Sequence, residues 1–336
     1  MSENPKVEYR AKDFASDQEV RWCPGCGDYA ILKSVQKAMP EIGIEKKDIV
    51  FVSGIGCSSR FPYYMDTYGF HSIHGRAPAI ASGVKMANPN LSVWQITGDG
   101  DALAIGGNHF IHALRRNIDI NILLFNNRIY GLTKGQFSPT TSLGHKTKTS
   151  PQGSIDNPFN PGELALGAGA QFFARIEDIN PKGMTSIFIE AEKHKGTSLV
   201  EILQNCVIFN DKVFKEWTAK EVKTEAFLRV EHGKPMIFGK DRNKGIIQNG
   251  FKLEVVEIGK DGITEDDLVV HDAHEEDTTL HMMLVNLRMP MVTGVIRSVK
   301  RDTFNERLSH QLEEIKATTR FKTVDDLLES GETWEI

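Results

Sequence analysis

The sequence has little cysteine and lacks any long apolar run. Its 336 residues include four cysteines. In a long intracellular chain these are more often metal-binding, catalytic or incidental residues than structural disulfides. No stretch approaches the roughly 18 consecutive apolar residues of a membrane-spanning helix, and the polar residues 1–20 carry no secretory signal. We therefore expect a cytoplasmic protein with no membrane partner.

The sequence also lacks a charge excess of the kind that binds nucleic acid. Its formal net charge is -5, from 40 basic and 45 acidic residues that are interspersed along the chain. Hydrophobic residues make up 40% of the sequence, which is ordinary for a globular protein and enough to bury a sizeable core. The length allows one large domain or two modest ones.

Apolar patterning predicts strands that alternate with helices. This alternation is typical of an α/β fold, in which a parallel sheet is covered by helices on both faces. The range 185–194 fits either a helix or a strand. The other predicted segments are strands at 49–52, 91–97, 120–125 and 198–203, and helices at 28–42, 77–87, 108–116 and 161–173.

The chain divides into three predicted parts. Residues 1–20 form an N-terminal arm, residues 21–235 form the main domain, and residues 236–336 form a C-terminal extension that packs on the core or on a partner. The polar, Gly- and Pro-rich run 131–161 is too long for a passive connection, so we expect a functional loop. Within the extension, 306–316 is predicted as an exposed helix.

Three predicted strands end in polar or Gly-rich tips. The tips are Gly-Ile-Gly-Cys at 54–57, Gly-Asp-Gly-Asp at 98–101 and Asn-Asn at 126–127. Ligands of open parallel sheets bind beyond the carboxyl ends of the strands. We therefore expect the three tips to lie together along one edge of the sheet.

Two of these tips carry oxygen ligands suited to magnesium. Mg²⁺ takes about six oxygens, shared between protein groups and phosphates. Asp99 supplies a carboxylate, Asn127 a side-chain carbonyl, and Ile129 a backbone carbonyl. Gly98 and Gly100 let backbone N–H groups approach a diphosphate at the start of a helix. Gly-Asp-Gly alone also fits a tight turn, but the later Asn pair makes the arrangement resemble that of thiamine-diphosphate enzymes.

A nicotinamide site is the alternative for the tip at 54–57. That tip follows a strand but lacks the third glycine of the dinucleotide fingerprint, and Pro62 interrupts the helix that should follow. No Walker-type Gly-Lys-Ser/Thr loop occurs in the sequence. The sequence therefore favours neither a nicotinamide site nor a Walker-type nucleotide site.

The cysteines form a metal-binding pattern. Cys23 and Cys26 belong to a Cys-Pro-Gly-Cys hook, whereas Cys57 and Cys206 follow predicted strands. Four thiolates suit either tetrahedral zinc or an iron–sulfur cluster, and their spacing does not separate the two. The hook alone also fits a zinc knuckle or a redox dithiol. The position of Cys57 beside the diphosphate edge favours a cluster, because an electron acceptor is useful there.

In combination, these motifs resemble the β subunits of 2-oxoacid:ferredoxin oxidoreductases, within the pyruvate:ferredoxin oxidoreductase superfamily. The resemblance covers about residues 20–215. The matching stretches are Cys-Pro-Gly-Cys-Gly at 23–27, Ser-Gly-Ile-Gly-Cys-Ser-Ser-Arg at 53–60, His-Gly-Arg at 74–76, Thr-Gly-Asp-Gly-Asp-Ala at 97–102, Ile-Gly-Gly-Asn-His-Phe at 105–110, the run 126–136, and Ser-Pro-Thr-Thr at 138–141.

The resemblance implies a thiamine-diphosphate-binding domain and its ligands. It implies Mg²⁺ on Asp99, Asn127 and Ile129, and a 4Fe–4S cluster on the four cysteines. The implied contacts with the organic cofactor are Ile55, Gly56, Cys57, Ser58, His74, Gly75, Gly98, Gly100, Asp101, Ala102, Gly131, Leu132 and Thr133.

Two further residues are candidates for catalysis. Arg60 is tied by the resemblance to substrate binding, and an arginine can hold a carboxylate in a bidentate grip. A structural ion pair is the alternative for this residue. His74 could orient the cofactor or donate a hydrogen bond to the substrate, or it could be a packing residue. His109 and His112 are interpreted as structural.

The implied reaction is thiamine-dependent oxidative decarboxylation of a 2-oxoacid. Coenzyme A receives the acyl group, carbon dioxide is released, and electrons pass through the cluster to ferredoxin, in either direction. The Gly-Cys-Ser-Ser-Arg form favours 2-oxoglutarate, with pyruvate or a broad range of 2-oxoacids as the alternative. An α subunit would supply the pyrimidine-binding domain and the catalytic glutamate, in an (αβ)2 assembly.

Two competing interpretations remain at this stage. One is a non-redox thiamine decarboxylase or acyloin synthase that carries a structural zinc. The other is an accessory or electron-transfer module that kept the fold and lost catalysis. The presence of Asp99, Asn127 and all four cysteines argues against the second.

Overall fold

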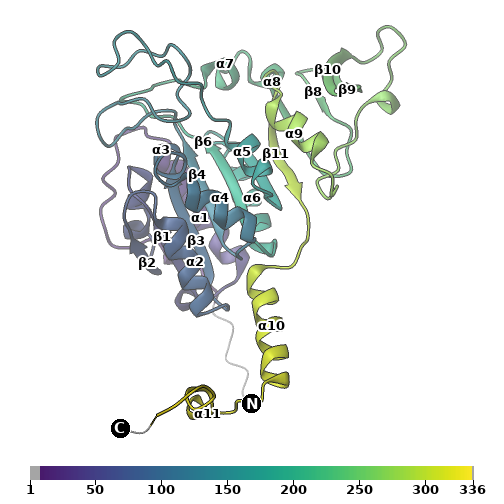
Figure 1. Ribbon diagram of the computed structural model, residues 1–336. Helices are drawn as coiled ribbons and strands as arrows, with labels where there is room; N and C mark the ends of the chain where they lie inside the picture. Colours follow the sequence, from purple (N-terminus) through teal and green to yellow (C-terminus); the bar gives the residue numbers. More distant parts are fainter. Residues whose placement is uncertain (1–7, 335–336) are drawn as a thin grey trace.

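The computed structural model describes residues 8–334 and places an eight-stranded sheet between two layers of helices (Figure 1). The first seven residues of the predicted arm lie outside the described part. The strands are β1 Ile49–Ser53, β2 Tyr68–His71, β3 Ser92–Gly98, β4 Asn121–Asn126, β5 Phe172–Glu177, β6 Ser198–Leu203, β7 Phe227–Val230, β8 Ile237–Phe238, β9 Lys244–Asn249, β10 Lys252–Glu257 and β11 Met291–Ser298.

Eleven α-helices accompany these strands in the described part of the chain. They are α1 Asp28–Ile42, α2 Ala77–Ala87, α3 Asp99–Leu103, α4 Gly107–Arg116, α5 Pro161–Gly167, α6 Pro181–Lys193, α7 Lys215–Thr218, α8 Lys223–Ala226, α9 Thr279–Asn286, α10 Phe304–Thr318 and α11 Val324–Leu328. Short 3-10 helices are η1 Ala11–Phe14, η2 Lys46–Asp48, η3 Ser58–Tyr64 and η4 Glu265–Asp267.

The main sheet is mostly parallel, as the sequence predicts. Its strand order is β2-β1-β3-β4-β6-β5-β11-β7. The strands from β2 to β5 run parallel to their neighbours, whereas β11 runs antiparallel to β5 and parallel to β7. Because β1, β3 and β4 are parallel neighbours, the tips that follow them lie along one edge of the sheet. This confirms the predicted arrangement of the tips.

Side chains that alternate along the strands fill two separate cores. On β1, Val50 and Val52 pack with α2, α4, α5 and α9, whereas Ile49 and Phe51 pack on the opposite face with α1 and α6. Strands buried on both faces read as continuous apolar runs, which is the pattern that the sequence showed at 49–52 and 120–125. The predicted cover of helices on both faces is therefore confirmed (Figure 1).

The predicted helix at 161–173 is shorter in the structure. It ends at Gly167, and Gly169 follows with φ +82°, a conformation that glycine adopts without strain. Phe172 then begins β5, a fully buried strand that the sequence pattern did not separate from the helix. The ambiguous range 185–194 belongs to helix α6, which Asn180 caps by accepting a hydrogen bond from Gly183 N.

The C-terminal residues contribute to the main sheet as well as to outer structure. β11 lies between β5 and β7, and β8, β9 and β10 form a small antiparallel sheet to one side (Figure 1). The predicted helix at 306–316 is the exposed α10, which begins at a capping box of Thr303 and Glu306. No helix within residues 8–334 is long and apolar enough to cross a membrane.

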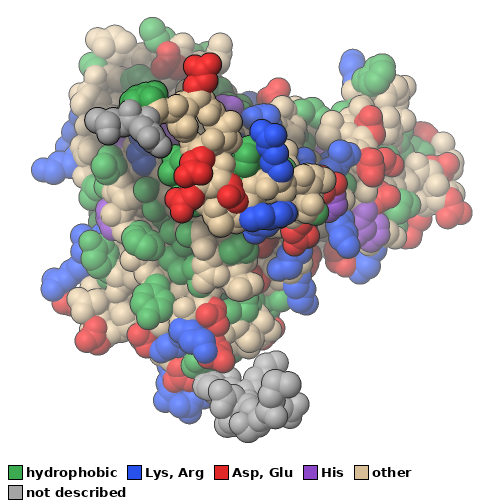
Figure 2. Space-filling model, turned by 60° about the horizontal axis from the view of Figure 1, so that its bottom comes forward, with side chains coloured by type: hydrophobic (Ala, Val, Ile, Leu, Met, Phe, Trp, Pro, Cys, Tyr) green, Lys and Arg blue, Asp and Glu red, His purple; other side chains and the backbone are tan. Residues whose placement is uncertain are grey.

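The surface carries charges of both signs. Figure 2 shows lysine, arginine, aspartate and glutamate side chains intermingled over the face it presents, with hydrophobic side chains between them. That face shows no continuous basic stripe.

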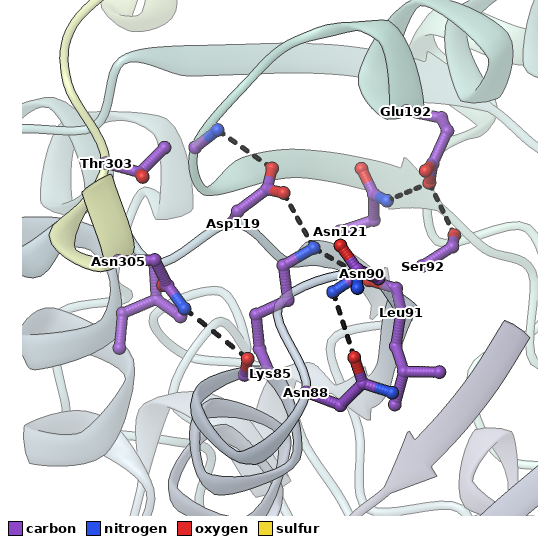
Figure 3. A network of polar contacts seen from close by, with 12 residues as sticks. Lys85, Asn88, Asn90, Leu91, Ser92, Asp119, Asn121, Glu192, Thr303 and Asn305 are labelled. Carbon is purple, nitrogen blue, oxygen red and sulfur yellow. Dashed lines mark hydrogen bonds and ion pairs between the residues drawn. The ribbon is translucent and has the colours of Figure 1, made fainter. Parts of the chain in front are cut away.

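A buried polar network connects elements at the amino end of the sheet (Figure 3). Lys85 of α2 is 5% exposed, and its ammonium contacts Asp119 Oδ2 and Leu91 O, both at 2.7 Å. Asp119 also accepts a hydrogen bond from Gly196 N at 3.1 Å. Asn305 of α10 donates to Lys85 O at 3.4 Å. The network thus ties α2 to the loop before β6 and to the start of the C-terminal helix.

Lys85→Met should lower the free energy of unfolding by about 2–3 kcal/mol. The substitution keeps the apolar stem but leaves a largely buried carboxylate and a carbonyl without their cation. Chemical denaturation measures the change. Lys47→Met is the matched control, because Lys47 and its partner Glu45 are both more than half exposed and should contribute almost nothing. Equal effects of the two variants would contradict a stabilising role for the network.

Candidate functional site

A cavity of about 540 Å³ lies at the carboxyl edge of the sheet, where the predicted tips meet. Three residues that were predicted to contact the substrate or the organic cofactor do not line this cavity. They are Arg60, Gly75 and Ala102. Ala102 is buried in the core, at 1% exposure. The predicted residues that do line the cavity are Ile55, Gly56, Cys57, Ser58, His74, Gly98, Asp99, Gly100, Asp101, Asn127, Ile129, Gly131, Leu132 and Thr133.

Close backbone approach requires glycine at two of the tips. A Cβ at Gly54 would lie 1.8 Å from Asp101 Oδ2, and a Cβ at Gly100 would lie 2.2 Å from a ring carbon of Tyr130. The Tyr130 hydroxyl donates a hydrogen bond to Gly100 O at 2.9 Å. The glycines therefore let buried polar groups pack directly against the backbone around the cavity.

The Asp101 carboxylate links the tip at 54–57, the His-Gly-Arg run at 74–76 and strand β3. It is buried, and its Oδ1 accepts hydrogen bonds from Ile55 N at 3.1 Å and Gly75 N at 2.7 Å. The same oxygen lies 2.7 Å from His74 Nδ1, and Oδ2 accepts from Thr97 Oγ1 at 2.7 Å. Because Asp101 engages Nδ1, the imidazole Nε2 is left for other partners.

Asp99 is positioned by the loop that follows β4. Its Oδ2 accepts hydrogen bonds from Ser138 Oγ and from Thr140 Oγ1, the latter at 2.6 Å. Burial raises the pKa of Asp99, and the hydrogen bonds from Ser138 and Thr140 partly offset that rise. A buried carboxylate of this kind is stabilised by a cation, and Asn127 and Ile129 line the same cavity.

A chain of buried polar side chains extends from Thr140 into the sheet and supports the position of Asp99. Thr140 Oγ1 donates to Asn126 Oδ1 at 3.0 Å, and Asn126 Nδ2 donates to Glu201 Oε1 at 2.8 Å. Glu201 is paired with Arg175 at 2.7 Å, and both side chains are almost fully buried. Arg175 donates in turn to Asn160, the N-cap of α5. Asp99 is therefore fixed by contacts that extend across β4, β6 and β5.

Burial disfavours negative charge in the cavity. It is the largest cause that raises the pKa of Asp28 to about 7, that of Cys57 to about 12, and that of Tyr130 to about 12. For Asp28 the nearby negative charge of Asp178 adds to the rise. An anionic ligand such as a diphosphate would therefore need a positively charged ion beside it.

Three segments bring the four cysteines together. Trp22 Nε1 donates to Cys57 O at 2.7 Å, and Gly27 N donates to Asn205 O at 3.3 Å. These bonds join the Cys23–Cys26 hook to the segments that carry Cys57 and Cys206. A Cβ at Gly131 would lie 3.5 Å from Cys206 Sγ and 3.7 Å from Cys57 Sγ, so both sulfurs face the edge of the cavity.

The four thiols form a donor set that suits a metal centre. Four thiolates can bind either a zinc ion, at about 2.3 Å, or an iron–sulfur cluster.

Arg60 lies near the cavity without an acidic partner. Its Nε donates to the Tyr64 hydroxyl at 3.0 Å. Among the residues that the structure describes, no carboxylate lies within ion-pair distance of its guanidinium, so the structural ion pair that the sequence left open is not observed. The Arg60 guanidinium is therefore available to bind a ligand carboxylate.

Several residues at the site had no role assigned from the sequence. Ser138 and Thr140 hold Asp99, Tyr130 packs on Gly100, and Asn126 links Thr140 to Glu201. The Ser-Pro-Thr-Thr run at 138–141 was visible as a motif. However, it lies about forty residues from Asp99, and only the fold shows that the two meet.

Comparison with known proteins places these features in a family. Residues 54–202 match the family described as "Thiamine pyrophosphate enzyme, C-terminal TPP binding domain". The chain is 50% identical over 333 residues to 2-oxoglutarate oxidoreductase subunit KorB of Mycobacterium tuberculosis, which covers 97% of this chain and 88% of that one. It is 46% identical over 203 residues to the 2-oxoacid:ferredoxin oxidoreductase subunit beta of Saccharolobus solfataricus, which covers 60% and 67%.

A solved structure shows the same similarity across the whole chain. The 2-oxoglutarate:ferredoxin oxidoreductase from Magnetococcus marinus, with 2-oxoglutarate, coenzyme A and succinyl-CoA bound, matches with a TM-score of 0.78 and 30% identity over 98% of both chains. The predicted resemblance and the predicted enzyme class are thereby confirmed. The chain belongs to the family of β subunits of 2-oxoacid:ferredoxin oxidoreductases and is part of a thiamine-type oxidoreductase.

Proposed function

We propose that this β subunit acts in the coenzyme-A-dependent oxidative decarboxylation of 2-oxoglutarate, in either direction, with ferredoxin as the electron partner. One observation carries the proposal: Cys57 lines the cavity that also contains Asp99 and Asn127, so the cofactor site and the thiol group share a wall. The relative with 50% identity over most of the chain is named for 2-oxoglutarate, which favours this acid over pyruvate.

The cavity residues fit thiamine diphosphate and magnesium. Bound thiamine diphosphate would supply the electron sink that decarboxylation of a 2-oxoacid requires. Asp99, Asn127 and the carbonyl of Ile129 would hold Mg²⁺, while Ser138 and Thr140 keep one oxygen of Asp99 engaged and so orient the other. The backbone N–H groups of Gly98 and Gly100, at the N-terminal end of α3, would face the diphosphate.

The four cysteines would hold a 4Fe–4S cluster at the edge of the cavity. Cys57 and Cys206 lie beside Gly131, whose missing side chain leaves room next to both sulfurs. Gln204 Nε2 donates to Cys26 Sγ at 3.2 Å, a contact that would stabilise charge on that sulfur. Electrons from the cavity would thus have a short path to a redox centre on the same chain.

Two residues would recognise the substrate. Arg60 carries a guanidinium with no acidic partner among the described residues, which suits a substrate carboxylate. His74 is fixed by Asp101 on its Nδ1 side, so its Nε2 is presented as a hydrogen-bonding group at the cavity. Asp101 would act as a positioning residue, since its carboxylate is already occupied by four donors.

The active enzyme would require an α subunit. Among the described residues that line the cavity there is no glutamate, and thiamine enzymes of this type use one against the aminopyrimidine ring. A partner would supply it together with the pyrimidine-binding domain, in an (αβ)2 assembly. The edge strand β2 exposes Tyr68 and Phe70, which offers apolar surface near the cavity to such a partner. A cytoplasmic location is part of this proposal.

Anaerobic protein, co-expressed with its partner, should reduce ferredoxin or a viologen when given 2-oxoglutarate and coenzyme A. Rates with pyruvate, and rates without coenzyme A, should be at least tenfold lower. Asp99→Ala should abolish turnover because Mg²⁺ loses its carboxylate, whereas the exposed Asp156→Ala control should not. A faster rate with pyruvate would contradict the substrate assignment, and no reduction by cofactor-loaded protein would contradict the reaction itself.

Cys206→Ala should remove the visible absorbance of the cluster and most of its iron. Loss of one thiolate leaves an incomplete set of cluster ligands. Iron and acid-labile sulfide, measured by elemental and colorimetric analysis, should fall together, while thiamine diphosphate binding persists. Wild-type protein that contains stoichiometric zinc and no sulfide would instead favour the non-redox thiamine decarboxylase.

Asp101→Asn should lower kcat about 10- to 100-fold and leave thiamine diphosphate binding nearly unchanged. The amide can still accept hydrogen bonds from Ile55 N and Gly75 N and can donate one to Thr97. However, it lacks the negative charge of the carboxylate that contacts His74 Nδ1. The double variant with His74→Ala should lose no more than His74→Ala alone, because both changes affect one group. Additive losses would indicate that Asp101 acts independently of His74.

A further inference from the structure

A second cavity, of about 440 Å³, lies on the other side of the loop that holds Asp99. Asn126 and Thr140, whose side chains contact each other at 3.0 Å, line it. Ligand pockets commonly have volumes of about 300–1,000 Å³, and this cavity is within that range. Among its described lining residues, Asn126 is the one that belongs to the three tips, and none of them also lines the first cavity.

The charges around this second cavity are unbalanced. Arg128, Arg175 and Arg288 line it, and Glu201 is the one acidic side chain among its described lining residues. Arg175 and Glu201 neutralise each other, with Nε to Oε2 at 2.7 Å and exposures of 5% and 2%. The remaining two guanidinium groups leave the cavity with a positive charge.

Arg128 is the cation without a counter-charge. Its side chain is half-buried, and its guanidinium carbon lies 4.7 Å from the centre of the Phe214 ring and 5.6 Å from that of Trp217. Its side chain has one hydrogen bond within the described chain, a long contact of 3.5 Å to Ser142 Oγ. No carboxylate is within ion-pair distance of it among the described residues. Packing against the two rings fixes the orientation of the guanidinium group and leaves its N–H groups available to hydrogen-bond other partners.

Arg288 adds a mobile positive charge at the same cavity. It faces Glu216 at 3.7 Å, and its side chain is 81% exposed. An exposed ion pair of this length contributes little, so the guanidinium is free to turn to a better partner. Two arginines with planar donor forks suit an oxygen-rich anion such as a phosphate or carboxylate.

The rest of the lining combines apolar and aromatic residues with the uncharged polar residues Asn126, Thr140, Ser142, Asn160 and Asn286. Trp217 is buried in the wall, whereas Phe159 is 50% exposed. Leu143, Leu203 and Met291 contribute further apolar surface. An inorganic ion alone would leave these groups in contact with water. A ligand that carries an apolar or planar body next to its acidic group would cover them.

We propose that this second cavity binds an organic anion, with the acidic group on Arg128 and an apolar or planar body against Phe159 and Trp217. The acidic group is a phosphate or a carboxylate. The site is separate from the cofactor cavity, and its existence does not depend on the reaction proposed above. Because Thr140 lines this cavity and its hydroxyl contacts Asp99, a ligand here contacts a side chain that positions Asp99.

The test uses full-length protein with the subunit it is purified with, saturated with thiamine diphosphate and Mg²⁺ so that the cofactor cavity is filled. AMP, benzoate and inorganic phosphate serve as probes, and calorimetry reports binding. We expect saturable binding of AMP or benzoate that is at least tenfold tighter than that of phosphate. The tighter of the two identifies the acidic group.

Substitutions of Arg128 test whether this residue binds the acidic group of the ligand. Arg128→Gln should weaken binding at least tenfold, and Arg128→Lys, which keeps the charge and loses the fork, should weaken it less. Arg115→Gln, an exposed arginine on α4, is the matched control and should bind like the wild type. Binding that survives in both Arg128 variants, failure of AMP and benzoate to bind, or phosphate binding as tight as theirs would overturn the proposal.

Discussion

The buried carboxylate of Asp101 is the contact on which the site depends. It accepts donors from the tips after β1 and β2 and from β3 itself, and no other group in the described chain replaces those bonds. Its position requires that Gly54 carry no side chain. A buried carboxylate is stable only when several donors satisfy it, so the three segments must be in place together. The cavity is therefore assembled as one unit.

A second network of buried polar side chains crosses the sheet. It runs from Asp99 through Thr140 and Asn126 to Glu201 and Arg175. Each member is buried and has partners on both sides. Such networks add rigidity when they are fully satisfied. The carboxylate of Asp99 is thereby connected through Thr140 and Asn126 to the strands of the sheet, which fixes its position in the cavity.

Sequence patterns could predict four strands of the main sheet, β1, β3, β4 and β6, and the positions of the tips, because continuous apolar runs reflect burial on both faces. The cysteine hook and the Gly-Asp-Gly motif were visible because their members are close in sequence. The contacts of Ser138 and Thr140 with Asp99, and of Arg175 with Glu201, join distant segments and depend on register. The strand β5 was hidden because Phe172 and Phe173 continue the apolar pattern of the preceding helix.

The place of β11 in the sheet affects how the chain can fold as it is made. Residues 291–298 pair with β5, which is synthesised more than a hundred residues earlier. Until they emerge from the ribosome, the edge of β5 has no neighbour on that side, and an unpaired strand edge invites pairing with other chains. Nascent chains should therefore depend on a chaperone more than the stability of the finished protein suggests.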